Sequence, residues 1–203
     1  MTTLIRRATA VAAALTVSAL LAACGGGATP GSTGGSGADV EGPHNEADVT
    51  FAQGMLPHHR QAIEMSELAA DRAEDPEVLT LTEEISAAQE PEIRTLTAFL
   101  EAWGADVPAE DMSMDGMDHG GDEAMDDMAG MMGPDDMTAL ESAQGAEFDE
   151  MFLQMMVEHH EGAVDMAETQ VDEGENPGAV DLAETIIETQ ESEIQRMQDL
   201  LDS

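Results

Sequence analysis

The sequence has no lysine, no tyrosine and a single cysteine, and its six basic residues, all arginine, face 44 acidic ones. One cysteine excludes an intramolecular disulfide, and it leaves thioether and imidazole groups as the main soft donors of the chain. The formal net charge of −38 repels nucleic acid and anionic lipid head groups and attracts cations. Nucleic-acid binding is therefore excluded, and most of the acidic residues are expected to form a solvated surface.

The N-terminus has the pattern of a bacterial lipoprotein signal. Arg6 and Arg7 form a basic start, and the apolar run 11–21 that follows is too short to span a bilayer comfortably. The run ends in Leu-Ala-Ala-Cys, which resembles the lipobox in which cleavage precedes the cysteine and the thiol receives a lipid. We therefore predict a signal peptide over 1–23, a membrane-anchoring lipid on Cys24 and a location in the cell envelope outside the cytoplasm. An ordinary signal peptide with an incidental cysteine is the alternative.

The mature chain divides into a tether and a duplicated domain. Residues 24–44 are rich in Gly, Ser, Thr and Pro and predict a flexible linker, and the domain occupies 45–203. Residues 48–100 and 149–201 align without a gap at an offset of 101, with 20 of 53 positions identical. This register indicates a duplication, with repeat 1 at 48–103 and repeat 2 at 135–201. Between them, the Met- and Asp-rich segment 104–134 predicts a mobile surface loop.

Each repeat predicts a helical hairpin. Apolar residues recur at three- and four-residue spacing, the period of one helix face. Asp75-Pro76 and Asn176-Pro177 then pair a preferred N-cap residue with a proline, which is tolerated at the first helical position, so a second helix begins there in each repeat. Two such hairpins predict an all-α fold, an antiparallel four-helix bundle with pseudo-twofold symmetry.

Paired histidines in both repeats are the main candidates for chemistry. On a helix, Met55, His58 and His59 lie within an arc of about 100° that must face the bundle core. Met156 and the pair His159-His160 repeat this arrangement. A Met–His pair four residues apart can bind one ion, and thioether with neutral imidazole suits Cu(I), whereas imidazole alone also suits Zn or Cu(II).

The candidate metal ligands come from the helices and from the loop. Methionine is a common core residue, and a buried histidine is often a structural hydrogen-bond partner, so packing stays open as the alternative for the helical residues. Loop methionines bury nothing and favour metal capture or sacrificial oxidation. The candidates are Met55, His58, His59, Met65, Met156, His159, His160 and Met166 in the helices, and Met114, Met117, His119, Met131 and Met132 in the loop. Asp48, Glu92, Asp149 and Glu193 are candidate ligands or groups that orient the imidazoles.

The motif D-x-x-F-x-Q-x-M-x-x-H-H-x-x-A-[IV]-x-M, present in both repeats, resembles the domain of unknown function 305 family over about residues 45–203. The resemblance implies a secreted or lipid-anchored ferritin-like bundle, and some members of that family bind copper through Met and His. It carries over to Asp48, Met55, His58, His59 and Met65, and to Asp149, Met156, His159, His160 and Met166. The Glu-x-x-His signature of di-iron carboxylate proteins is missing, which counts against an oxidase.

We therefore predict a non-enzymatic lipoprotein that binds a metal ion, copper above all, for sequestration, transfer or tolerance, with no organic cofactor. An envelope scaffold whose histidine pairs are structural is the alternative from another class, and a metal-dependent redox enzyme is the least favoured.

Overall fold

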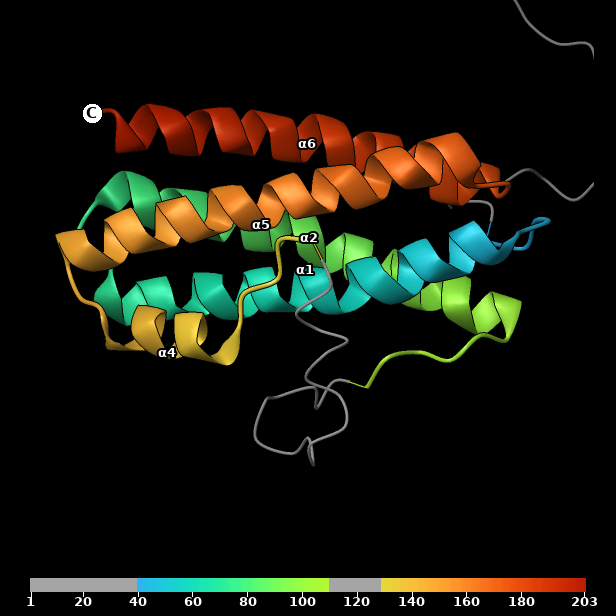
Figure 1. Ribbon diagram of the computed structural model, residues 1–203, viewed down its shortest axis with the longest axis horizontal. Helices are drawn as coiled ribbons and strands as arrows, with labels where there is room; N and C mark the ends of the chain where they lie inside the picture. Colours follow the sequence, from blue (N-terminus) through green and yellow to red (C-terminus); the bar gives the residue numbers. More distant parts are fainter. Residues whose placement is uncertain (1–39, 110–128) are drawn as a thin grey trace, which may run out of the picture. The chain divides into compact units, whose positions relative to one another are not determined.

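A computed structural model describes residues 40–109 and 129–203, and every regular element in these ranges is a helix (Figure 1). The fold is all-α, as predicted. The helices are α1 (Glu46–Arg72), α2 (Pro76–Trp103), α4 (Pro134–Ser142), α5 (Ala146–Glu173) and α6 (Pro177–Leu201).

The helices begin and end where the capping signals lie. The side chain of Asp75 caps α2 and that of Asn176 caps α6, each directly before a proline in the first turn. Gly104 ends α2 in a left-handed conformation, with φ of 66°. Pro57 and Pro91 lie inside α1 and α2 without ending either helix. The short helix α4 was not predicted, and it lies where repeat 2 was expected to begin.

The two repeats form antiparallel hairpins that pack through their first helices. Helix α1 packs on α2 and α5 on α6, while α1 runs antiparallel to α5 between the hairpins (Figure 1). The backbone N–H of Gly145, at the start of α5, donates to the carbonyl of Arg72 at the end of α1. Helices α2 and α6 meet at few places, one of them the ion pair of Arg196 with Glu84. The predicted four-helix bundle of two duplicated hairpins is confirmed.

Two equivalent aspartates connect the repeats at opposite ends of the bundle. Asp48 accepts hydrogen bonds from the backbone N–H groups of Glu175 and Asn176 in the α5–α6 turn, at 3.1 and 3.2 Å. Asp149 accepts from the N–H groups of Glu74 and Asp75 in the α1–α2 turn, at 3.2 and 2.8 Å. Each repeat therefore holds the turn of the other, because its carboxylate accepts from backbone N–H groups at the start of the other hairpin's second helix.

The apolar core is divided into two clusters. One combines the second half of α1 with the first half of α5 and includes Met65, Phe148 and Met156. The other combines the first half of α1 with the second half of α5 and includes Phe51 and Met55. The buried histidines lie at mid-length of α1 and α5, so a polar layer lies between the two clusters.

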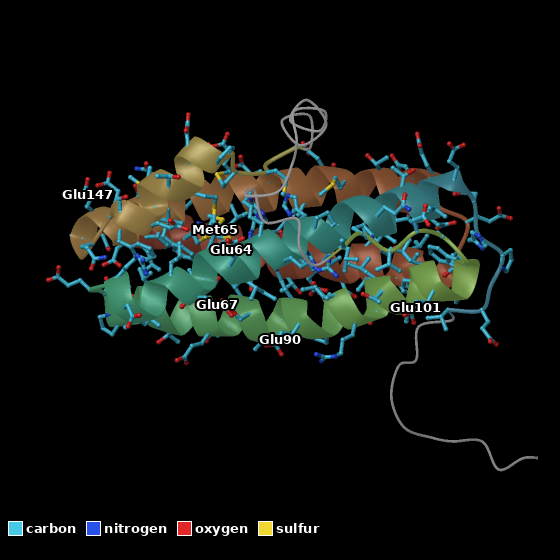
Figure 2. All side chains as sticks on the ribbon, turned by 90° about the horizontal axis from the view of Figure 1, so that it is seen from below. Glu64, Met65, Glu67, Glu90, Glu101 and Glu147 are labelled. Carbon is cyan, nitrogen blue, oxygen red and sulfur yellow. The ribbon has the colours of Figure 1, made fainter. Side chains whose placement is uncertain are left out.

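Acidic side chains cover the outside of the helices. Figure 2 labels Glu67, Glu90 and Glu101, which are exposed on α1 and α2. At Glu64, partial burial and the nearby carboxylates of Glu141 and Glu67 raise the pKa. Within residues 40–109 and 129–203, no helix combines the length and the hydropathy that crossing a bilayer requires.

Candidate metal centre

The four paired histidines meet at the centre of the bundle. His58 and His59 are at mid-length of α1, His159 and His160 are at mid-length of α5, and all four are fully buried. The antiparallel packing of α1 on α5 brings their midpoints together. His58 and His159 occupy the same position of the two repeats, and their ring centroids are 3.7 Å apart with an interplanar angle of 39°.

The other two imidazoles each contact a glutamate on the second helix of their own hairpin. His59 Nε2 is 2.7 Å from Glu92 Oε2, and His160 Nε2 is 2.8 Å from Glu193 Oε2. These glutamates are nearly buried, with side-chain exposures of 12 and 13%. A neutral imidazole that donates its N–H to a carboxylate keeps a lone pair on the other nitrogen, which is the usual arrangement around metal-ligating histidines.

Several buried ring nitrogens have no hydrogen-bond partner among the described residues. These are Nδ1 of His58, His59 and His160, and both nitrogens of His159. In His58, Nε2 lies 3.2 Å from the carbonyl oxygen of Ala129. A carbonyl only accepts, so Nε2 carries the proton and Nδ1 presents a lone pair. Buried polar atoms are usually satisfied, and this cluster of exceptions is the observation that fits a bound ion.

Burial keeps the central pair neutral. Burial first, then the imidazoles of His59 and His160, lower the pKa of His58 to about 3, against the raising effect of the Ala129 carbonyl. Burial and the imidazoles of His58, His160 and His59 lower the pKa of His159 well below 6.5, with a small opposing effect of the His58 backbone. Each of the two rings therefore keeps a lone pair at neutral pH, the form in which imidazole binds a metal.

The methionines of the predicted site have three different environments. Met55 and Met156 are fully buried one turn before His59 and His160, so their thioethers are placed next to the polar layer. Met65 is packed in an apolar cluster six residues beyond His59, roughly 9 Å along the helix. Met166, its equivalent, is half-buried and lines a groove of about 580 Å³ between α1 and α5. The two repeats are thus alike at the first methionine and different at the second.

Two of the predicted acidic residues do not reach the imidazoles. Asp48 and Asp149 are ten residues before His58 and His159, roughly 15 Å along each helix, and their carboxylates bind interhelical turns. Their expected role beside the histidines is corrected to a structural one. Residues that share one face of a helix can still lie far apart along its axis.

The end of the predicted loop is packed against the site. Met132 is 6% exposed and belongs to an apolar cluster, so the expectation of an exposed thioether is wrong there, while Met131 is half-buried. Gln61 donates to the carbonyl of Met132 and accepts from its N–H, at 2.9 and 2.8 Å. Sequence reasoning missed Gln61, because its equivalent in repeat 2 is a glycine and no motif marks it. Met114, Met117, His119 and Cys24 lie outside the described residues.

The described residues do not form a complete site from hard and borderline donors alone. Within 40–109 and 129–203, no three side chains of His, Cys, Asp or Glu gather into a group that could hold a metal ion. An ion at the polar layer would therefore need the thioether of Met55 or Met156, or a rotation of the rings, to complete its ligands. Mixed thioether and imidazole donors suit Cu(I).

Solved structures with the same fold include metal-bound proteins. A DUF305 protein of Streptomyces coelicolor, described as secreted, is 34% identical with a TM-score of 0.66 over 77% of this chain and 92% of its own. CopM in its Cu(I)-bound form is 32% identical with a TM-score of 0.59, over 76% of this chain and 95% of its own. CopM has also been solved with Cu(II) and with silver.

A curated viral protein shares a shorter segment. Protein L153 of Acanthamoeba polyphaga mimivirus is 35% identical over 54 residues, so the match covers 27% of this chain and 36% of that protein's length. The family model DUF305, a domain of unknown function, matches residues 48–201. That range covers most of the sequence, and the chain belongs to the DUF305 family.

Proposed function

We propose that this protein binds copper at the polar layer between α1 and α5, without catalysing a reaction, and that it acts outside the cytoplasm, tethered by a lipid on Cys24. The observation that carries the proposal is the group of buried imidazole nitrogens that lack hydrogen-bond partners among the described residues. The Cu(I)-, Cu(II)- and silver-bound forms of CopM support the choice of a soft metal.

The proposed ligands are buried ring nitrogens that have no hydrogen-bond partner among the described residues. His59 and His160 are oriented by Glu92 and Glu193, and their Nδ1 atoms remain for a metal. His159 offers either nitrogen. Copper, when bound, is the cargo of the site, and the surrounding apolar clusters exclude water from it.

The thioethers of Met55 and Met156 are the proposed soft donors. Each is fully buried one turn from a histidine of the layer. Outside this layer, the proposed capture sites Met114, Met117 and His119 lie beyond the described residues, and Met131 is the half-buried donor nearest to them in sequence.

Anaerobic titration of the full-length protein with Cu(I) against a colorimetric chelator tests the proposal. We expect binding much tighter than millimolar, and we expect replacement of the four paired histidines by alanine to weaken it to what the proposed capture sites of the loop can supply. His44→Ala is the matched control, because His44 is exposed and stacks on Trp103 away from the layer. Wild-type affinity in the fourfold variant, or no binding by the wild type, would overturn the proposal.

Thermal melting separates this function from a scaffold with structural histidines. If the histidines only stabilise the fold, His159→Ala lowers the melting temperature equally with and without copper. If they bind the metal, copper raises the melting temperature of the wild type and leaves that of the variant unchanged, because only a ligand that binds the folded state stabilises it.

A further inference from the structure

The two repeats differ at one position next to the central imidazoles. Gln61 on α1 corresponds to Gly162 on α5, at the offset of 101. The buried amide of Gln61 makes two hydrogen bonds with the main chain of Met132, donating at 2.9 Å and accepting at 2.8 Å. One side chain therefore satisfies both backbone groups of a single residue, as a neighbouring strand would.

Gly162 lets the same segment lie directly on helix α5. A Cβ atom at Gly162 would be 2.1 Å from the carbonyl oxygen of Ala129 and 2.7 Å from the Cα atom of Gly130. Gly130 has φ of 78°, and a Cβ there would be 2.7 Å from the carbonyl oxygen of Glu158 and 2.9 Å from that of His159. Neither position has room for any other residue without a backbone shift.

This packing makes the central imidazoles chemically different. The carbonyl of Ala129 reaches Nε2 of His58, which must then carry the proton. The carbonyl of Ala129 does not reach the equivalent ring, His159. The backbone of His58 acts on the pKa of that ring, but neither of its nitrogens makes a hydrogen bond in the part of the chain that the structure describes. In His58 a hydrogen bond therefore fixes which ring nitrogen carries the proton. In His159, the equivalent ring, no such hydrogen bond fixes it.

We propose that residues 129–133 form a strap over the site, and that Gln61 and Gly162 are positioning residues that press it onto His58. The strap fixes Nδ1 of His58 as the nitrogen available to a metal, and it slows the release of a bound ion on that side. The second part rests on the proposed copper binding, whereas the fixed tautomer is a property of the metal-free protein.

Gly162→Ala is the direct test, because its methyl group has no room beneath Ala129. Gly54→Ala on α1 is the matched control, since its Cβ would meet only the sulfur of Met166 at an ordinary 3.5 Å. Both changes give a helix the same gain in propensity. Nitrogen-15 chemical shifts of the histidine rings in full-length, metal-free protein report the tautomer, and transfer of Cu(I) to excess chelator reports the rate of release.

In the wild type and in Gly54→Ala we expect His58 to carry its proton on Nε2. In Gly162→Ala we expect the Nδ1-protonated form to appear and Cu(I) to leave about tenfold faster, as the loss of one buried hydrogen bond predicts. Gln61→Met keeps the size of the side chain, removes both bonds to Met132 and should have the same effects, so it serves if Gly162→Ala does not fold.

Two results would overturn the strap. One is a wild-type His58 that carries its proton on Nδ1, and the other is an unchanged tautomer and release rate in both Gly162→Ala and Gln61→Met. If the wild type binds no Cu(I), the proposed function fails, while the ring shifts of metal-free protein still decide whether the strap positions His58.

Discussion

Mild acid should destabilise the metal-free protein through its two central histidines. His58 is buried with a pKa of about 3, while the same side chain in the unfolded chain has a pKa of 6.5. Between these values the unfolded state binds the extra proton, so this contribution to the free energy of unfolding is complete above pH 6.5 and is lost as the pH falls toward 3. The direction is the same for His159, whose pKa is also lowered.

The size of the effect follows from the linkage relation. At pH 5, a site with these two pKa values has lost about 2 kcal/mol of stability relative to pH 7. His159, whose pKa is lowered for the same reason, acts in the same direction. The loss from His58 alone is already a large share of the 5–15 kcal/mol that is typical of a domain. At Asp48, burial raises the pKa, but hydrogen bonds from the backbone and from Gln170 outweigh burial and lower the pKa below 3.8. The stability that this carboxylate contributes is therefore lost only at more acid pH.

Urea unfolding of full-length protein at pH 7 and pH 5, with chelator present, measures this loss. The variant His58→Gln/His159→Gln removes the titrating rings, and His44→Gln is the exposed control. Protonation of surface carboxylates relieves self-repulsion in every variant, so the difference between variants isolates the histidines. Equal pH dependence of the wild type and the double variant would refute the argument that burial holds these rings neutral.

Three further outcomes follow from single residues. Asp149→Ala removes the acceptor of two backbone N–H groups in the α1–α2 turn and should lower the free energy of unfolding by about 3 kcal/mol, against less than about 0.5 kcal/mol for exposed Asp165→Ala, by denaturant titration. Glu92→Gln should weaken copper binding about 10- to 100-fold in chelator competition, because the carboxylate that orients His59 is lost, whereas exposed Glu83→Gln should leave it unchanged. Gly104→Ala should lower the free energy of unfolding by about 1–2 kcal/mol, because an alanine is strained at the φ of 66° found there. An unchanged melting temperature of the variant would refute this prediction.

The boundaries of the helices could be predicted because they depend on neighbouring residues. A capping side chain before proline begins α2 and α6 whatever packs on them. The helix period also placed Met55, His58 and His59 on the buried face correctly, and the duplication did the same for α5. The helix α4 escaped prediction because its Met- and Asp-rich surroundings show no apolar period.

Contacts between distant segments could not be derived from local pattern. Asp48 shares a helix face with the histidines, yet it binds a turn more than 120 residues away in sequence, since only the antiparallel packing of α1 on α5 brings that turn to it. The position of Ala129 over His58 depends on Gly162 having no side chain, and this matters only when a third segment lies on the helix.

The sequence by itself determined the helices, the duplication and the inward-facing imidazoles, because periodicity and capping act within a few residues. The tertiary structure alone decided that His58 and His159 face each other and that Glu92 and Glu193 orient the outer rings. It also decided that the carbonyl of Ala129 holds His58 but does not hold His159. The physical reason is that these relations depend on how the hairpins cross, and the sequence of either hairpin alone does not specify that crossing.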